Sequence, residues 1–598
     1  MVAMFCYEGV TKPRDGCDWV VVFSAVTCIH IARALYSLSH FSLMPFAPRS
    51  LGTTAGAVLG MMAAAVGSLA TLTIAPLAAQ SGPAARAAGA ASVATTPVST
   101  THPTLVVFLT IDQMRAEYLD RYQSQWTGGF ARLAKGGAVF TNAYHDHATT
   151  ETAPGHAATL SGRFPRSTGI VLNNLGVGDS AAPLVGGIGD GASPKRFRGT
   201  TLVDWLAARD ARSKTLSISR KDRAAILPVG RSKASVFWYV SDGRFTTSTY
   251  YADTLPTWLV EFNARREPQR YIGKAWTPLL PDSAYAEPDS VMYEAGGTDF
   301  VFPHTVSTDT TKAVASLPAF PMMDDVTLDA AMAGLTAMHL GVGPATDVLA
   351  ISLSTTDAVG HKYGPDSKEI HDQLLRVDRA LGVFLDSLYK VRDGSRIIIA
   401  LTADHGVQAL PEVAITREHR IVQRVDLSGL ALEYQRALAP RGVPAAAFDL
   451  NESILMIDRP AFAAAHVDAD SVITAFAEAA KARPGVQRVD WVRKLASEDT
   501  VNDATARRWA HAIPADMPAE LVISLVPGNI WGSDVSAHHG GPSDLDAHVP
   551  VILYGASFKA GRYDGVARVV DMAPTLAAVL GVTPGEPVDG VVLTAALR

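Results

Sequence analysis

The stretch Leu105-Val-Val-Phe-Leu-Thr-Ile-Asp112 is a nearly uninterrupted apolar run that ends at a carboxylate. Such a run is typical of a parallel strand that is buried on both faces. Three later runs share this character: Asp347–Leu353, Arg396–Leu401 and Val549–Leu553. Between the first two of these, Lys368–Leu388 carries apolar residues at helical spacing. Strand, helix and strand in succession predict an α/β fold with a largely parallel central sheet sandwiched by helices.

The composition of the 598 residues indicates a well-buried globular body, with 48% apolar and 18% charged residues. The formal charge of −6 gives no reason to expect nucleic-acid binding by charge. All three cysteines, Cys6, Cys17 and Cys28, lie in the first thirty residues. The rest of the chain therefore cannot use a disulfide, a thiolate ligand or a cysteine nucleophile. This excludes zinc-finger chemistry and a cysteine-derived formylglycine nucleophile.

Residues 1–80 are interpreted as a leader with a signal peptide. Arg49 precedes Leu51–Leu77, which has no charged residue, and Leu77-Ala-Ala-Gln80 offers a small-residue cleavage site. Met44 is the expected true start of translation. The alternative is an uncleaved membrane anchor, because the run is long enough to span a bilayer. With cleavage no stable membrane span remains, and a periplasmic or secreted protein is predicted.

The remainder divides into a linker and one large domain. Residues 81–103 are rich in Ala, Ser, Thr and Pro, which indicates a flexible linker. Residues 104–598 are expected to form a catalytic domain that ends with an apolar helix at 569–580, closed by Gly581. Insertions near 233–345 and 408–535 break the strand–helix rhythm. We expect them to cover or flank a site beyond the carboxyl ends of the strands.

Aspartate and histidine residues follow the predicted strands in a pattern that suits two metal ions. They are Asp112 after the first strand, Asp357 and His361 after the second, Asp404 and His405 after the third, and His539 in a loop before the fourth. Divalent metals bind carboxylate oxygens and imidazoles, and two ions about 4 Å apart need roughly three protein ligands each. A carboxylate after a strand is also common as a helix cap or turn residue. The ordered set, rather than any one member, therefore predicts a two-metal hydrolytic site.

Thr152, within Thr149-Thr-Glu-Thr-Ala-Pro-Gly-His156, is the candidate nucleophile. A hydroxyl at a helix start lies near backbone N–H groups that can receive a phosphoryl oxygen, and a metal ion can hold it as the alkoxide. The alternative is a helix N-cap with Pro154 in the first turn. His156 is expected to support the site or the core without binding metal.

Asn173, Lys221 and Arg223 form a second polar set. A Lys and an Arg two apart on an extended segment would point the same way and offer several donors to phosphate oxygens. The alternative is an exposed basic pair, but the apolar residues 224–228 that follow favour a buried location. A terminal phosphate, with two charges and three free oxygens, suits such donors better than a diester does.

Together these motifs resemble the alkaline phosphatase superfamily, in particular its type I phosphodiesterase and nucleotide pyrophosphatase branch. Within that branch the chain is most similar to the threonine-dependent bacterial alkaline phosphatases, from about Leu105 to Leu580. The motifs that carry the resemblance, in the family's order, are Thr152-Ala-Pro-Gly-His156, Asp357-Ala-Val-Gly-His361, Thr402-Ala-Asp-His-Gly406 and Asp546-Ala-His-Val-Pro550.

The resemblance implies two zinc ions, although aspartate and histidine ligands would also suit manganese or iron. One ion would be held by Asp357, His361 and His539, and the other by Asp112, Thr152, Asp404 and His405. Thr152 would form a phosphothreonine intermediate. Asn173, Lys221 and Arg223 match phosphate-oxygen donors of the monoesterases, and the diesterase relatives lack the Lys and Arg.

Two features depart from the family pattern. Leu175 and a glycine-rich segment follow Asn173 where the monoesterases usually have an aromatic residue. The pair His538-His539 offers two imidazoles where one is usual, and His539 is chosen because it directly precedes Gly540.

The predicted function is a secreted, metal-dependent phosphomonoesterase that acts on small-molecule phosphate esters. A phosphodiesterase or nucleotide pyrophosphatase with the same metals is the alternative, because the Trp- and Tyr-rich range 233–345 could stack a base. A more remote alternative is a non-catalytic, metal-stabilised binding protein on the cell surface.

Overall fold

The computed structural model describes residues 102–187, 189–534 and 536–598. The expected leader, and the expected linker up to residue 101, lie outside the described residues. In the part of the chain that is described, no helix combines the length and apolarity needed to cross a lipid bilayer.

A nine-stranded mixed sheet forms the centre of the described chain, and five adjacent strands of it, the fourth to the eighth in its order, are parallel. The order is β18 (Gly561–Tyr563), β2 (Ala138–Phe140), β17 (Val551–Tyr554), β10 (Ile397–Thr402), β1 (Leu105–Ile111), β9 (Asp347–Leu353), β4 (Thr215–Ser219), β5 (Ser235–Val240) and β6 (Arg244–Thr246). Every residue of β1, β9 and β10 is buried, as their apolar sequences predict. The α/β fold with a largely parallel sheet is therefore confirmed.

The fourth apolar run differs from the expectation in its direction. It forms β17, which pairs antiparallel with both β10 and β2. Periodicity shows that a run is buried but does not show its direction, because the connection before it decides which way the chain enters the sheet.

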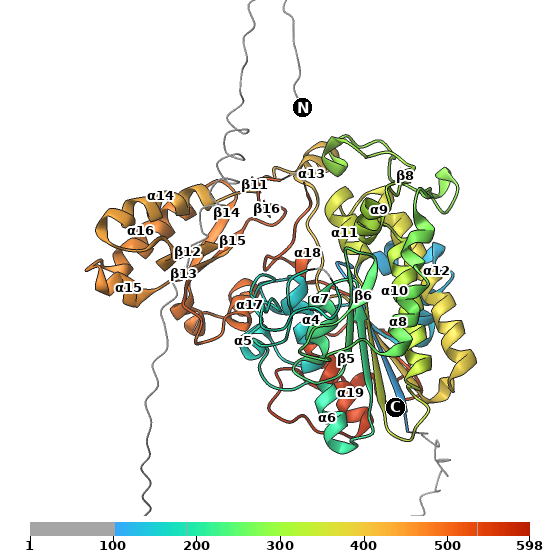
Figure 1. Ribbon diagram of the computed structural model, residues 1–598. Coiled ribbons are helices and arrows are strands. Elements are labelled where there is room, and N and C mark those ends of the chain that lie inside the picture. The colour runs from blue at the N-terminus through green and yellow to red at the C-terminus, as the bar shows by residue number, and fades with distance from the viewer. Residues whose placement is uncertain (1–101, 188, 535) are drawn as a thin grey trace, which may run out of the picture. The chain divides into compact units, whose positions relative to one another are not determined.

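Helices cover both faces of the sheet (Figure 1). One layer contains α3 (Gly129–Gly136), α8 (Thr257–Ala264), α10 (Met322–Ala337) and α12 (Lys368–Val391). The other contains α4 (Thr152–Ser161), α6 (Leu202–Arg209), α7 (Asp222–Ile226) and α19 (Met572–Leu580). The predicted helix at 368–388 is α12, whose first turn is capped by Ser367 Oγ accepting from Ile370 N at 3.1 Å. The last helix ends at Gly581, which is left-handed at φ +65°.

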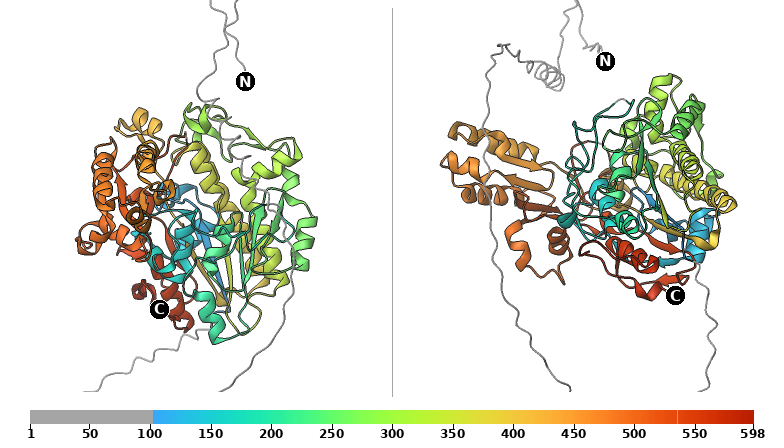
Figure 2. Two further views of the ribbon diagram at one scale, coloured as in Figure 1. Left: turned by 60° about the vertical axis from the view of Figure 1, so that its left-hand side comes forward. Right: turned by 60° about the horizontal axis from the view of Figure 1, so that its bottom comes forward.

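Residues 424–534 build a second, smaller lobe, orange in Figures 1 and 2. Its antiparallel sheet has the order β12 (Phe448–Asn451), β13 (Ile454–Ile457), β15 (Ala519–Leu525) and β14 (Val486–Trp491). With α14 (Ser428–Leu438), α15 (Arg459–Ala464) and α16 (Ala469–Lys481) it encloses its own apolar core. Helix α17 (Ala504–Ala512) joins the lobe to the body, where Ala148 N donates to Arg508 O at 3.0 Å. By contrast, the range 233–345 contributes β5 and β6 to the central sheet itself.

The remaining elements are short and connect or flank these layers. They are α2 (Tyr118–Arg121), β3 (Ala143–Tyr144), α5 (Pro165–Thr168), β7 (Ala275–Trp276), β8 (His304–Thr305), α9 (Thr310–Ser316), α11 (Thr355–Tyr363), α13 (Pro411–Glu418), β11 (Arg424–Val425), β16 (Ile530–Trp531), α18 (Asp544–Ala547) and β19 (Ala567–Arg568).

Candidate active site

The carboxyl ends of four neighbouring parallel strands bring the candidate residues together. Asp112 follows β1, Asp404 follows β10, α11 with Asp357 follows β9, and Lys221 follows β4. These strands are adjacent in the order β10, β1, β9, β4, so their ends meet at one edge of the sheet. This is the place where open α/β sheets carry ligand sites.

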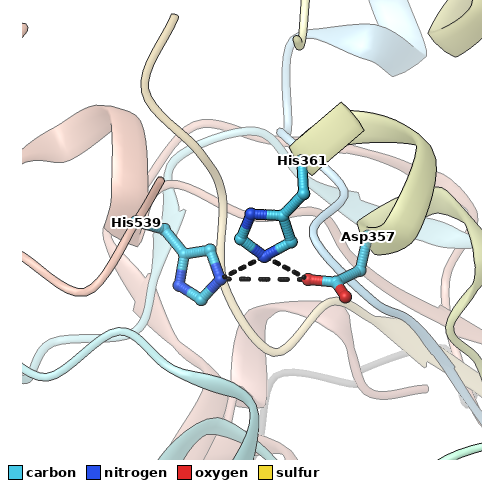
Figure 3. Close-up of side chains that lie close together, drawn as sticks. All are labelled: Asp357, His361 and His539. Atoms are coloured by element: carbon cyan, nitrogen blue, oxygen red, sulfur yellow. Dashed lines mark hydrogen bonds and ion pairs between the residues drawn. The ribbon is translucent and has the colours of Figure 1, made fainter. Parts of the chain in front are cut away.

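Asp357, His361 and His539 point toward one another in the first group of possible metal ligands (Figure 3). His361 Nε2 lies 3.2 Å from both His539 Nε2 and Asp357 Oδ1. The Nδ1 atoms of the two histidines lie 2.6 Å from Ala537 O and 2.8 Å from Thr150 O. A carbonyl only accepts, so each Nδ1 donates, and in the neutral form of each ring the Nε2 lone pair is directed toward Asp357. Three acceptors that face one another suit a metal cation.

Asp112, Asp357 and His405 form the second group. His405 Nδ1 lies 2.9 Å from Gly406 O, which again leaves Nε2 as an acceptor, 3.5 Å from both Asp112 Oδ1 and Asp404 Oδ2. Two of these facing atoms, His405 Nε2 and Asp112 Oδ1, are buried and have no hydrogen-bond partner among the described residues. Buried acceptors without donors are costly, so this donor set also fits a cation. The rings of His405 and His539 stack at 3.6 Å between centroids and link the two groups.

His539 rather than its neighbour lies in the ligand group. His538 Nε2 is instead 2.6 Å from Asp534 Oδ1, in a partly exposed pair. The loop is held by Ala537 N, which donates to His361 O at 3.0 Å, and by Gln408 N, which donates to His538 O at 3.0 Å.

Lys221 connects the candidate nucleophile to both groups. Its Nζ lies 3.1 Å from Thr152 Oγ1, 2.7 Å from Asp357 Oδ2 and 2.8 Å from Asp112 Oδ2. The side chain is only 6% exposed. A buried ammonium among carboxylates next to a hydroxyl can stabilise negative charge on that hydroxyl oxygen.

Thr152 is the first residue of α4, and Glu151 occupies the N-cap, so the N-cap interpretation of Thr152 is wrong. The N–H groups that follow are not available to a ligand. Ala153 N donates to Asn173 Oδ1 at 2.8 Å, Pro154 has no N–H, and Gly155 N donates to Glu151 O at 2.9 Å. Donors to a phosphoryl group near Thr152 must therefore come mainly from side chains.

Asn173 is fixed against the start of α4 by two hydrogen bonds. Besides the bond from Ala153, its own N donates to Glu151 Oε2 at 2.7 Å. With Oδ1 engaged, the Nδ2 group is the part of the side chain that can donate to a ligand. Burial, together with the nearby Glu452 carboxylate, raises the pKa of Glu151 to about 8.

The sequence had suggested that Lys221 and Arg223 lie on one extended segment. The structure shows that they do not. Lys221 is the N-cap of the short helix α7, and Arg223 lies in its first turn. Its side chain is 29% exposed, and its charge lowers the pKa of Glu151. Arg223 therefore lies near the start of α4, outside the carboxylate cluster.

His156 supports the site without joining either ligand group, as expected. Its Nδ1 lies 2.9 Å from Thr152 O and 3.1 Å from Asp404 Oδ2, and its Nε2 lies 2.9 Å from Ser352 Oγ.

Gln113 is a supporting residue that the sequence interpretation missed. Its N donates to Asp404 Oδ1 at 3.0 Å and its Nε2 donates to Asp357 Oδ1 at 3.1 Å, so it bridges both groups. It is buried and adopts φ +66°, which is unusual for a residue with a side chain. The one feature of the sequence that could have identified Gln113 is that a polar residue directly follows Asp112. Arg220 was also missed, and its guanidinium lies 2.8 Å from Ser354 O and 3.5 Å from Asp357 Oδ2.

The surroundings of Asp357 and His539 favour the protonation states that bind metal, whereas burial raises the pKa of Asp112. Burial would raise the pKa of Asp357, but the charges of Lys221 and His361 hold it well below its usual range. Burial also lowers the pKa of His539 well below its usual value, with His405 and His361 adding to the effect. An ionised carboxylate and a neutral imidazole are the forms that bind metal.

Comparisons with known proteins place the chain in a family of phosphate-ester hydrolases. A model of the type I phosphodiesterase / nucleotide pyrophosphatase family matches residues 106–524. Alkaline phosphatase PhoV of Synechococcus elongatus is 31% identical over 526 residues, which cover 84% of this chain and 94% of that protein. Alkaline phosphatase PafA of Elizabethkingia meningoseptica is 29% identical over 534 residues, which cover 82% of this chain and 94% of that protein. The crystal structure of wild-type PafA matches with a TM-score of 0.77 and 28% identity, covering 84% of this chain and all of that one. The chain belongs to the type I phosphodiesterase / nucleotide pyrophosphatase family.

Proposed function

We propose that this protein is a metal-dependent phosphomonoesterase that hydrolyses small-molecule phosphate esters in the periplasm or outside the cell. The observation that carries the proposal is the position of Thr152 Oγ1, 3.1 Å from a lysine ammonium that also contacts Asp112 and Asp357. Two relatives that match over most of their length are named alkaline phosphatases, which supports the monoesterase assignment.

The ligands of two zinc ions would be Asp357, His361 and His539 for one, and Asp112, Asp404, His405 and Thr152 for the other. Divalent metal ions would supply Lewis-acid stabilisation of negative charge on the attacking and leaving oxygens. Manganese or iron would fit the same donors.

The residues of the chain then have distinct tasks. Thr152 Oγ1 forms a bond to phosphorus while the bond from phosphorus to the leaving-group oxygen breaks, which gives phosphothreonine and a free alcohol. Lys221 stabilises charge on Oγ1, and Asn173 Nδ2 and Arg223 donate to the phosphoryl oxygens. Water then breaks the threonine–phosphorus bond and releases phosphate.

The side-chain donors favour a monoester over a diester. Because the N–H groups of Ala153 and Gly155 are engaged, the side chains of Lys221 and Arg223 would add positive charge for the two charges of a monoester, and Asn173 would add a neutral donor. A diester has one charge and an additional substituent. The family also includes diesterases by its name, so a diester preference is the second candidate.

The test is steady-state hydrolysis of an aryl phosphate and the matching aryl diester, with zinc supplied and Thr152→Ala as the control. We expect a large monoester preference that the control abolishes, together with two zinc ions per chain by elemental analysis and loss of activity with a chelator. A diester preference would move the assignment to the phosphodiesterases. Equal turnover by Thr152→Ala would refute the nucleophile.

A further inference from the structure

A pocket of about 190 Å³ opens beside the first ligand group, and His539 forms part of its wall. The opposite wall comes from the lobe, with Trp531, Leu427 and Leu450 among its apolar residues. His539 is thus shared by the pocket and the first ligand group. The volume of the pocket suits a group of a few heavy atoms, below the range of pockets that bind drug-sized ligands.

Glu452 reaches from the lobe to the residues around Thr152. It lies in the two-residue turn between β12 and β13, at φ +50°. A Cβ placed on Gly540 would be 3.8 Å from Glu452 Oε2 and 3.7 Å from Glu151 Cγ. The Glu452 carboxylate therefore adjoins Gly540, which follows His539, and Glu151, which precedes Thr152. Left-handed turn positions favour Gly, Asn or Asp, so turn geometry does not account for a glutamate here.

Apart from His538 and His539, the ionisable side chains that line the pocket are acidic. Glu452 and Asp426 line it, and its described lining contains no lysine or arginine. Asp426 accepts from Ser428 N at 2.8 Å but remains exposed to solvent. The nearby Arg424 is engaged by Glu412, at 3.0 Å and 3.2 Å. Two carboxylates beside an indole attract an ammonium group and repel an anion.

We propose that this pocket holds the leaving group of the phosphate ester, and that Glu452 selects small leaving groups with a positively charged nitrogen. Leaving groups with a further negative charge are disfavoured. The inference rests on the proposed function, because it assigns the other half of the substrate at the same site. His539 touches both the ligand group and the pocket, so a phosphoryl group at Thr152 directs its ester oxygen toward this space.

Three short esters of similar size test the charge preference: phosphoethanolamine, propyl phosphate and phosphoglycolate. For each ester, kcat/KM of the Glu452→Gln variant is divided by kcat/KM of the wild type. The intrinsic reactivity of the leaving group is the same in both values, so it cancels from this ratio. Removing one charge is expected to lower kcat/KM for phosphoethanolamine about three- to tenfold and to raise it for phosphoglycolate by a similar factor. Propyl phosphate should change less than about twofold, and 0.5 M NaCl should shrink both effects.

The matched control is Glu433→Gln, which removes the same charge from an exposed position on α14 of the same lobe. It should leave all three ratios unchanged. If Glu452→Gln alters the three esters by one common factor, or alters none, the pocket assignment is refuted although hydrolysis persists. If no ester is cleaved in a Thr152-dependent manner, the proposed function fails first and the pocket assignment falls with it.

Discussion

Gly360→Ala should destabilise this protein although the same change normally stabilises a helix. Gly360 lies within α11, where alanine is ordinarily better than glycine by about 1 kcal/mol. A Cβ at this position would lie 1.8 Å from Gln113 Oε1 and 3.0 Å from Gln113 Cδ. The Gln113 side chain must therefore move, which breaks its 3.1 Å hydrogen bond to Asp357 Oδ1.

The magnitude follows from three contributions. Loss of a hydrogen bond to a charged group costs about 1.5–3 kcal/mol, and overpacking costs about 1–3 kcal/mol. The gain in helix propensity offsets about 1 kcal/mol, so a net loss of about 1.5–5 kcal/mol is expected. In a Gln113→Ala background the next neighbour of the Cβ is Ile370 Cδ1 at 3.7 Å, an ordinary contact. There Gly360→Ala should be neutral or stabilising.

Urea unfolding of wild type, both single variants and the double variant measures this change of sign. Metal content measured in parallel should fall in both single variants, because Asp357 loses the same support. Gly429→Ala in α14 is the matched control, since a Cβ there would meet nothing within 4 Å. Additive free energies of unfolding, within about 0.5 kcal/mol, would show that Gln113 and Gly360 do not interact as the structure indicates.

Two further predictions concern charge. Lys221→Ala and Arg223→Ala should each reduce kcat/KM for an aryl monoester roughly thirtyfold, which corresponds to a loss of about 2 kcal/mol of transition-state stabilisation. Each variant should affect the matching diester less. Equal losses on both esters would contradict the assignment of these two residues to the phosphoryl group. Asp324 in α10 is buried, which raises its pKa to about 7, and it accepts from Gln373 Nε2 at 2.7 Å. The folded state therefore binds more protons than the unfolded state between about pH 4 and pH 7, and stability falls as pH rises through this window. Asp324→Asn should remove the contribution of Asp324 to this loss of stability, up to about 4 kcal/mol in the free energy of unfolding. Urea unfolding at pH 5 and pH 8 measures the difference. If the variant and the wild type show the same change between the two pH values, Asp324 is not protonated in the folded state.

The part of the site that sequence could predict is the part that the central sheet positions. Asp112 follows β1 directly, Asp404 lies two residues after β10, and Asp357 and His361 lie one helical turn apart on α11. Apolar runs locate the strands, and neighbouring parallel strands end at one edge, so residues just past those ends must converge. The helix spacing of Asp357 and His361 follows from local geometry in the same way.

Other features depend on contacts that no local pattern encodes. The antiparallel direction of β17 follows from the path of the chain before it. The role of Gln113 requires a left-handed backbone that is uncommon for glutamine. The donors at the start of α4 were expected to be free, but Asn173, twenty residues away, takes the first of them. Each of these features is set by tertiary packing, which overrides the local signal.

The position of Lys221 suggests how ligand binding at the two parts of the site is coupled. An ammonium has three N–H donors. Lys221 donates to Asp357 and Thr152, and its charge is paired with Asp112 at 2.8 Å. Carboxylates that ligate a metal ion have less need of a lysine donor, so the donors of Lys221 become available to a phosphoryl oxygen. The affinity of phosphate for the metal-loaded protein should therefore exceed the affinity that its direct contacts with the metal would provide by themselves. By linkage, phosphate should raise metal affinity by the same factor, and Lys221→Ala should reduce this reciprocal effect.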